Sequence, residues 1–275
     1  MTSLPVIAIL GAGSMGGAIL NGLLQPGVQV DGRIRVTNRS TAKAAALASD
    51  RVLSLSLETD PSANLAAADG ARIVLLGVKP AMIPDLLREV APALEADTIV
   101  VSIAAGVTIS TMEALVPQTV LRAMPNTPAL VGKGVTGLST GSRASASEVD
   151  LVRSVFETVG RVLEVAEERI DALSAISGSG PAYVFYLIEE LSRTARGMGF
   201  SEEEARVMVG GTFLGAAELL EASGEDPAEL RRRVTSPKGT TERAVAVLQE
   251  AGLGELFDRA TAAALARAKE LAAGS

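Results

Sequence analysis

The sequence predicts an α/β fold: a mostly parallel sheet with helices on both faces over residues 1–165, then an all-helical domain over residues 166–275. In the first part, short and wholly apolar runs alternate with stretches that have helical spacing. After residue 166 no convincing strand follows. The chain has 275 residues, of which 48% are hydrophobic, which is enough for one large domain or two ordinary ones.

The first apolar run leads directly into a glycine-rich turn. Val6–Leu10 is continuous and apolar, as expected for a strand buried on both faces, and Gly17–Leu24 has the spacing of a helix. The turn between them, Gly11–Gly16, has the pattern GxGxxG. Here the first glycine permits the tight turn, the second lets a pyrophosphate approach, and the third lets helix and strand pack closely. The motif predicts a Rossmann-type dinucleotide-binding domain, with an ordinary glycine-rich turn as the alternative.

Further strands and helices continue the alternation. Strands are expected at residues 33–37, 72–78, 98–103, 118–123, 134–139 and 160–165, and helices at 42–49, 84–94 and 147–159. Ligands of such sheets bind beyond the carboxyl ends of the strands. Three clusters of small or special residues lie at those ends: Gly77–Pro80, Ile103–Ala105 and Met124–Pro128.

The end of the second strand bears on the choice of cofactor. An NAD enzyme usually carries an acid here to hold the ribose 2′-hydroxyl, but this chain has Asn38, Arg39 and Ser40. Asn38 can hydrogen-bond a ribose or phosphate, and Arg39 can pair with a 2′-phosphate. We therefore expect NADP (NADPH) as the cofactor, with NAD as the second candidate. The alternative is that Arg39 is only a solvated side chain beside a turn.

Composition excludes several classes of function. The net charge of -7 leaves no basic excess for a nucleic-acid partner. Cysteine and histidine are absent, so no metal site is expected and any chemistry must come from a cofactor, carboxylates, hydroxyls, lysine or backbone. Residues 1–30 lack charges but have no basic segment before the apolar run, and glycine, Asn21, Gln25 and Pro26 interrupt it. We expect no membrane span and a cytoplasmic protein.

The residue pattern after residue 166 predicts helices. Ala182–Ile188, after Pro181, is apolar nearly all round, which predicts a helix buried on every side. Ser201 and Glu204 form a capping-box start to a helix that carries Gly210-Gly211 in its middle. Two glycines inside a helix are costly, which favours the close approach of another helix or a ligand, with close packing inside one subunit as the alternative. Further helices are expected over residues 241–249 and 255–271.

A hydroxyl-rich loop, Val234–Thr241, runs into a helix N-terminus. Free N–H groups and the positive end of the helix dipole make such a place suitable for a carboxylate. The alternative is that Thr240 and Thr241 only cap the helix. A second glycine-rich segment, Ser177–Pro181, also precedes a helix and either bends round a ligand or joins two packed helices.

Four motifs together resemble pyrroline-5-carboxylate reductase: Val78–Pro80, Arg122–Pro128, Ser177–Tyr183 and Val234–Thr241. The resemblance covers essentially the whole chain. It implies reduction of 1-pyrroline-5-carboxylate to L-proline by NAD(P)H, the last step of proline biosynthesis, and a homodimer whose helical domains interlock, often as a ring of dimers. The missing histidine is no objection, because an imine that enters protonated is already electrophilic.

The resemblance also implies roles for particular residues. Thr241 is the catalytic hydroxyl on the ring nitrogen, and backbone N–H groups of Gly239, Thr240 and Thr241 hold the substrate carboxylate. The full set of expected substrate contacts is Glu167, Arg233, Ser236, Gly239, Thr240 and Thr241. With the end of the second strand included, the expected cofactor contacts are Leu10, Gly11, Ala12, Gly13, Ser14, Met15, Gly16, Asn38, Arg39, Ser40, Asn64, Gly77, Val78, Lys79, Pro80, Ile103, Ala104 and Ala105.

Two lysines and one arginine lie in or beside the motifs of the expected site. The family commonly has two glycines after the proline of its last motif, but this chain has Lys238 in place of the first. If this position needs a positive φ, the backbone of the lysine is strained there. If it lies at the mouth of the site, the charge of Lys238 favours an anionic substrate. Arg233 differs from the residue usual in the family and belongs to the run Arg231–Arg233, otherwise a solvated face. Lys79 is interpreted as a cofactor contact or surface charge rather than a catalytic acid.

Two other functions stay open at this point. A hydroxyacid dehydrogenase or broader imine reductase also joins a nucleotide domain to a helical one, but it needs a lysine or aspartate projecting from the helices, whereas residues 235–241 offer hydroxyls. A non-catalytic NADP-sensing module would keep the glycine turn and need no substrate loop.

Overall fold

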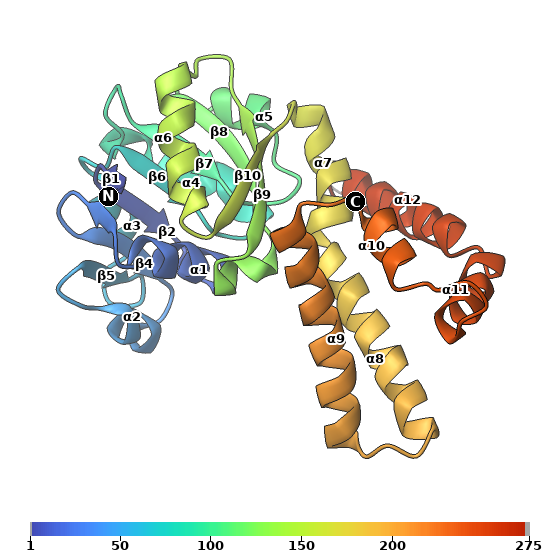
Figure 1. The fold of residues 1–275 in the computed structure, drawn as a ribbon. Coiled ribbons are helices and arrows are strands. Elements are labelled where there is room, and N and C mark those ends of the chain that lie inside the picture. The colour runs from blue at the N-terminus through green and yellow to red at the C-terminus, as the bar shows by residue number, and fades with distance from the viewer. Residues whose placement is uncertain (1, 273–275) are drawn as a thin grey trace. The chain divides into compact units, whose positions relative to one another are not determined.

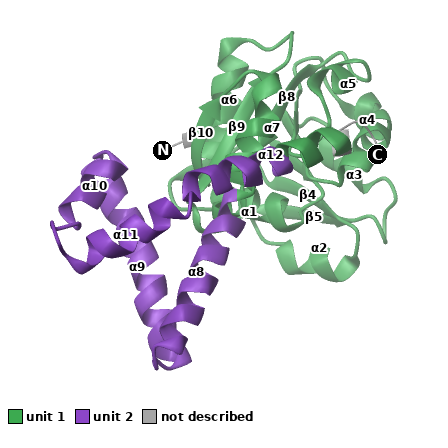
Figure 2. Cartoon of the chain, turned by 90° about the vertical axis from the view of Figure 1, so that its right-hand side faces the viewer, with its two compact units in different colours: residues 1–179, 265–275 green, residues 180–264 purple. Residues whose placement is uncertain are grey.

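The computed structural model describes residues 2–272 and divides into two compact units. Residues 1–179 and 265–275 make up the first unit, and residues 180–264 make up the second (Figure 2). The first unit therefore extends beyond the boundary expected at residue 165.

An eight-stranded sheet forms the centre of the first unit (Figure 1). Its strand order is β10-β9-β8-β7-β6-β2-β4-β5. All neighbours pair in parallel except β8 and β9, which confirms the mostly parallel sheet. The strands are β2 (Ile7–Leu10), β4 (Ile34–Asn38), β5 (Val52–Ser56), β6 (Ile73–Leu76), β7 (Ile99–Ser102), β8 (Thr119–Met124), β9 (Gly134–Thr140) and β10 (Gly160–Glu164). A separate parallel pair joins β1 (Thr2–Leu4) to β3 (Val28–Val30).

Helices cover both faces of the sheet. The α-helices of the first unit's continuous segment are α1 (Ser14–Leu23), α2 (Thr41–Leu47), α3 (Ala63–Ala68), α4 (Ile83–Val90), α5 (Ile109–Glu113), α6 (Ala146–Glu157) and α7 (Ile170–Leu173). Short 3-10 turns lie at η1 (Pro80–Met82), η2 (Ala91–Ala93), η3 (Thr127–Val131) and η4 (Glu167–Arg169). Side chains of α1 and α6 pack on one face, and those of α3, α4 and α5 pack on the other (Figure 1).

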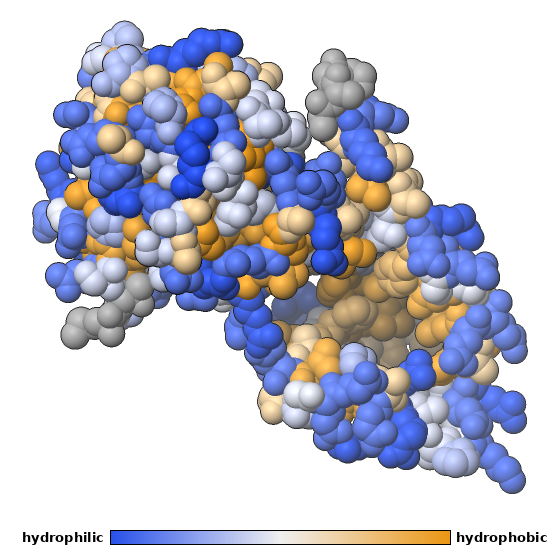
Figure 3. Space-filling model, turned by 90° about the horizontal axis from the view of Figure 1, so that it is seen from above, coloured by the Kyte–Doolittle hydropathy of each residue, from blue (hydrophilic) through white to orange (hydrophobic). Residues whose placement is uncertain are grey.

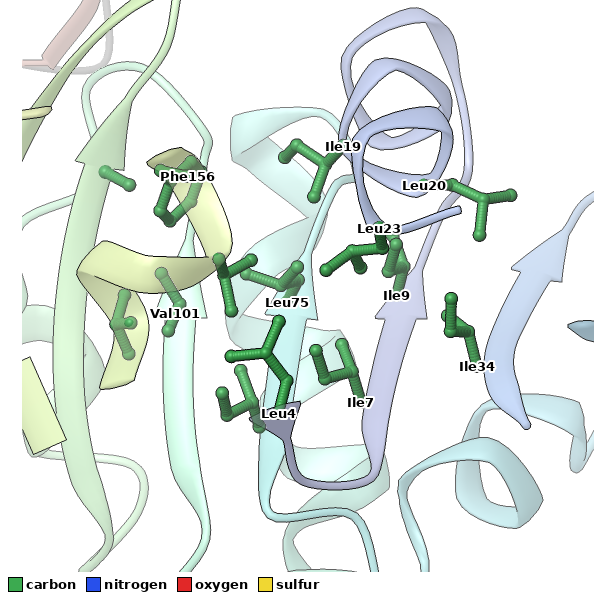
Figure 4. Packing of buried hydrophobic residues seen from close by; sticks show 14 of the residues in the cluster. Leu4, Ile7, Ile9, Ile19, Leu20, Leu23, Ile34, Leu75, Val101 and Phe156 are labelled. Atoms are coloured by element: carbon green, nitrogen blue, oxygen red, sulfur yellow. The ribbon is translucent and has the colours of Figure 1, made fainter. Parts of the chain in front are cut away.

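The alternation of side chains along β2 divides the core into two layers. Ile7 and Ile9 belong to the cluster under α1, whereas Ala8 and Leu10 belong to the cluster on the opposite face, and all four are fully buried. In Figure 4, side chains of α1 and of strands β2 and β6 converge in the first layer. A strand buried on both faces favours apolar residues at successive positions, which explains the continuous apolar runs.

The first unit extends past β10 because the next turns pack onto its sheet. A Cβ built on Gly137 of β9 would lie 2.8 Å from Leu173 Cδ1 and 3.2 Å from Ile170 Cδ1, so α7 lies directly on this strand. The helical path then continues through a π-helical segment, η5 (Ser174–Gly178), and the next helix begins at Gly180. Most of the glycine-rich segment Ser177–Pro181, which was expected only to precede a helix, is therefore itself helical.

The second unit is helical throughout, as expected. Its elements are α8 (Gly180–Gly197), α9 (Glu202–Ser223), α10 (Pro227–Arg233), α11 (Thr240–Glu250) and the first part of α12 (Leu253–Ala272). The capping box at Ser201 and Glu204 is present, with Glu204 N–H donating to Ser201 Oγ at 3.2 Å.

The prediction that the helix after Pro181 is buried on every side is wrong for the isolated chain. Phe185 is 65% exposed and Tyr186 is 61% exposed, because the described helices of this unit are too few to surround α8. Apolar side chains are also exposed on α9 and α11, and Figure 3 shows this apolar surface over the helical part of the chain. So much exposed apolar area is typical of a protein–protein interface. Within residues 2–272, no helix is long and apolar enough to cross a membrane.

Candidate active site

Parallel pairing brings the expected cofactor residues to one edge of the sheet. Leu10 at the end of β2 pairs with Thr37 of β4 and with Leu76 of β6, and Leu76 pairs with Ser102 of β7. The segments that follow these strands therefore start side by side. They are Gly11–Gly16, Asn38–Ser40, Gly77–Pro80 and Ile103–Ala105.

The glycine turn has the geometry that a dinucleotide requires. Gly11 has a φ of 93°, which favours glycine, and its N–H donates to Thr37 Oγ1 at 3.0 Å. A Cβ on Gly16 would lie 2.8 Å from the Gly11 carbonyl oxygen, whereas one on Gly13 would meet nothing within 4 Å. The first and third glycines are thus required by the protein itself, and the second leaves space for a ligand.

Helix α1 begins at Ser14, earlier than the residue 17 expected from the sequence. Its N-cap is Gly13, no side chain caps it, and no acid lies in its first turn. The first N–H groups of a helix have no partner within the helix. Here they follow the glycine turn directly and are available to a phosphate.

The end of β4 holds one buried and one exposed polar side chain. Asn38 is 5% exposed, and its Nδ2 has no hydrogen-bond partner among the described residues. A buried amide without a partner costs free energy, so this group fits a site that a polar ligand completes. Arg39 is exposed, and in the described part of the chain no carboxylate lies within ion-pair distance of its guanidinium.

Three other cofactor candidates are Asn64, Gly77 and Lys79. Asn64, on α3, is 6% exposed and donates from Nδ2 to Glu89 Oε1 at 3.2 Å, so its amide already has a partner. Gly77 is packed against the glycine turn, since a Cβ there would lie 2.5 Å from the Gly11 carbonyl oxygen. Lys79 is exposed at the start of η1.

Glu167 lies in a polar cluster of the first unit. Its Oε1 accepts the Ile109 N–H at 2.7 Å, and Arg122 Nη1 lies 3.4 Å from the same oxygen. Arg122 is 4% exposed and also pairs through Nη2 with Asp171 Oδ1 at 3.1 Å. The carboxylate of Glu167 is therefore held in a fixed orientation, and Arg122, which the sequence offered only as part of a motif, is the residue that holds it.

Asn126, in the same motif, links three segments of the first unit. Its Nδ2 donates to the Ser177 carbonyl at 2.9 Å, and its Oδ1 accepts the Val135 N–H at 2.8 Å. The first bond attaches the π-helical segment to the end of β8. Such segments are frequent at functional sites.

The loop before α11 contains a tight turn over Ser236–Gly239. Gly239 N–H donates to the Ser236 carbonyl at 3.0 Å, Pro237 occupies the second position, and Lys238 has a φ of 61°. Proline followed by a residue of positive φ is typical of a type II turn. Lys238 is the one non-glycine residue with positive φ among residues 2–272, so the condition under which lysine is strained is met.

This turn corrects one expected contact. Gly239 N–H is used inside the loop and is not available to a substrate carboxylate, although the sequence analysis counted it as free. Gly239 is instead the N-cap of α11, and Thr240 and Thr241 are its first two residues. No side chain caps this helix, so the capping alternative for the two hydroxyls is wrong. Their N–H groups are among those left for an anion.

Two further substrate candidates lie in the second unit. Ser236 is exposed at the start of the turn. Arg233 Nη2 lies 2.6 Å from Glu225 Oε2, and its Nε lies 3.0 Å from Glu229 Oε1. Its guanidinium is engaged by two carboxylates on the surface, in agreement with the solvated-face interpretation of the arginine run.

Comparison with known proteins supplies the family. A family model for pyrroline-5-carboxylate reductase dimerisation matches residues 167–271, and one for F420-dependent NADP oxidoreductases matches residues 6–106. A pyrroline-5-carboxylate reductase of Corynebacterium melassecola is 41% identical over 270 residues, which cover 96% of this chain and 98% of the relative. The chain belongs to the pyrroline-5-carboxylate reductase family. A relative from Pseudomonas aeruginosa is 38% identical and covers 98% of both chains.

Solved structures of this family share the fold. The structure of a pyrroline-5-carboxylate reductase from Coxiella burnetii matches with a TM-score of 0.86 at 36% identity, covering 96% of this chain and 97% of the other. The Plasmodium falciparum protein, whose structure has NADP bound, matches with a TM-score of 0.82 at 25% identity, covering 97% and 98%. The Rossmann-type domain and the helical dimerisation domain expected from the sequence are thus confirmed, and the exposed apolar surface of the second unit belongs to a domain that self-associates.

Proposed function

We propose that the protein reduces 1-pyrroline-5-carboxylate to L-proline with a nicotinamide cofactor, the last step of proline biosynthesis. The observation that carries the proposal is the start of α11, in a chain that also has the glycine turn Gly11–Gly16. There Thr240 and Thr241 offer N–H groups, and their hydroxyls make no hydrogen bond within the described residues. Relatives that match almost the whole chain bear the corresponding name.

In this mechanism the chain mainly binds and orients. The reduced nicotinamide, when bound, supplies the hydride to the imine carbon. The N–H groups of Thr240 and Thr241 hold the substrate carboxylate, favoured by the positive end of the helix dipole. The Thr241 hydroxyl hydrogen-bonds the ring nitrogen, which receives the electron pair of the C=N bond as the hydride adds. Because the imine enters protonated, no side chain has to act as a strong acid, and a chain without histidine can catalyse the step.

We propose NADPH as the preferred cofactor, because Arg39 is free to pair with a 2′-phosphate and the end of β4 carries no acid. Arg39→Ala is expected to weaken binding of NADPH far more than that of NADH. Equal weakening of the two nucleotides would contradict a contact with the 2′-phosphate.

The proposed assembly is a homodimer built through the helical unit, with a ring of dimers as a larger form. The apolar residues exposed on α8, α9 and α11 support burial against a second copy. Light scattering of the purified protein measures the mass directly. A mass of one chain at micromolar concentration would contradict this assembly.

The deciding experiment follows nicotinamide absorbance when the protein meets NADPH and 1-pyrroline-5-carboxylate, with proline identified as the product. Thr241→Ala should lower kcat about 100-fold or more, within the range that positioned proton and hydrogen-bond partners contribute, while Thr241→Ser retains most activity. Thr235→Ala is the matched control, since its hydroxyl donates to the Arg231 carbonyl at 2.6 Å. NADPH binding without turnover in the wild-type protein would favour the sensing module instead.

A further inference from the structure

An acid does lie beside the end of β4, but it comes from the neighbouring strand. β5 pairs in parallel with β4, with Asn38 opposite Ser56, so the residues after both strands are adjacent (Figure 1). Leu57 N–H donates to the Asn38 carbonyl at 2.9 Å, and Glu58 N–H donates to the Arg39 carbonyl at 3.1 Å. The backbone of Glu58 is thus attached to the residue proposed to bind the 2′-phosphate.

The carboxylate of Glu58 is held by one oxygen only. Its Oε2 accepts the Thr41 N–H at 2.9 Å and the Thr41 hydroxyl at 3.0 Å. These bonds hold the pKa of Glu58 below its usual range, with the backbone bond as the larger cause. Glu58 is exposed, and no hydrogen bond of Oε1 occurs among the described residues. A fixed, ionised carboxylate therefore presents a free acceptor oxygen beside the end of β4, where the ribose of the cofactor is expected.

Arg39 and Glu58 form no ion pair with each other in the described structure, although their backbones are hydrogen-bonded. Thr41 holds the carboxylate, which leaves the guanidinium free. A 2′-phosphate is attracted by Arg39 and repelled by Glu58. A 2′-hydroxyl is a donor that a carboxylate accepts and that gains little from a guanidinium.

We propose that Glu58 is a specificity-determining residue that accepts the ribose 2′-hydroxyl of NAD(H), so that the Arg39–Glu58 pair lets one site take both nucleotides. The proposal rests on the proposed function for the identity of the ligand class. Glu58, just after β5, then supplies the acid that the end of β4 lacks.

Glu58→Gln is the main test, since the amide oxygen can still accept the Thr41 N–H while the charge is lost. Loss of the charged acceptor should weaken NAD⁺ about three- to tenfold, and loss of repulsion should tighten NADP⁺ by a similar factor. The ratio of the two dissociation constants, measured by titration of the purified protein, should shift about tenfold or more towards NADP⁺. Arg39→Ala should shift it the other way.

Asp60→Asn is the matched control. Asp60 is the next acid along the chain, and its carboxylate is held in the same manner, by the N–H of Ser62 at 2.9 Å. This variant should leave the ratio within about twofold, because Asp60 is not bonded to Arg39 or Thr41 in the described structure.

The outcomes separate the two proposals because binding is measured without substrate. A shifted ratio in a protein that does not reduce 1-pyrroline-5-carboxylate would support the role of Glu58 and contradict the proposed activity. An unchanged ratio, or equal weakening of both nucleotides by Glu58→Gln, would overturn the role of Glu58 even if proline is formed. Thermal unfolding of each variant shows whether equal weakening reflects loss of the local fold, which would make Glu58 a structural residue only.

Discussion

Replacing Lys238 with glycine is expected to stabilise the helical unit. Lys238 has a φ of 61°, in the left-handed region, and its N–H donates to Glu242 Oε2 at 2.8 Å, so the turn cannot relax without losing that bond. The left-handed conformation costs a residue with a Cβ about 1–2 kcal/mol. Glycine removes this strain but loses about 0.5–1 kcal/mol through the greater freedom of the unfolded chain. The net gain is about 0.5–1 kcal/mol.

Gly224 provides the matched control, since it has a φ of 62° at the C-cap of α9. Gly224→Lys makes the reverse substitution in the same backbone conformation and should destabilise the protein by about the amount that Lys238→Gly gains. Lys238→Ala keeps the strain and removes the charge, so it should be nearly neutral. Urea unfolding of all variants at one protein concentration measures the free energies of unfolding and keeps the contribution of dissociation the same for each variant. If Gly224→Lys destabilises the protein and Lys238→Gly does not stabilise it, backbone strain at Lys238 does not lower the free energy of unfolding.

Three further predictions concern packing, buried charge and pH. Gly160→Ala should lower the free energy of unfolding by more than about 3 kcal/mol or prevent folding, because the added Cβ would lie 2.0 Å from a carbonyl oxygen of β9. Urea unfolding measures this loss, and a loss under about 1 kcal/mol would contradict the geometry. Arg122→Met should lower the free energy of unfolding by about 2–4 kcal/mol, since it leaves two partly buried carboxylates without their cation. In the same assay, Arg122→Lys should be less destabilising than Arg122→Met. The pKa of Glu229 is lowered to about 2 by hydrogen bonds from two arginines, so its contribution to stability is present above its ordinary value of 4.5 and is lost as the pH falls towards 2. The small stability difference between wild type and Glu229→Gln should therefore shrink over this range in pH-dependent unfolding, and a constant difference would contradict the lowered pKa.

The sequence was most informative where side chains are buried on both sides. Every strand expected from a continuous apolar run is present, because such a run suits a strand in a sheet that has helices on both faces. The missed strands lie outside that rule. β1 and β3 are three residues long and pair only with each other, and β5 is an edge strand whose sequence alternates leucine with serine.

The missed edge strand had a consequence for the site. Without β5, the sequence places no acid near the end of β4, and Arg39 alone then decides the expected cofactor. The register of β5 against β4 is what brings Glu58 to the same place. A residue whose role depends on pairing between strands cannot be found from its neighbours in the chain, whereas the glycine turn can, because its requirements are local.

The substrate loop shows the same limit at shorter range. A helix start predicts free N–H groups, but how many remain free depends on how the preceding loop uses them. Pro237 at the second position of a tight turn was the available signal, since it favours a bond from the fourth residue, Gly239, to the first, Ser236. With that N–H committed, the anion site of α11 begins at Thr240 and Thr241. The strained Lys238 is then a feature of the turn that sets the start of the helix, so relieving its strain should change stability more than it changes the contacts of the substrate carboxylate.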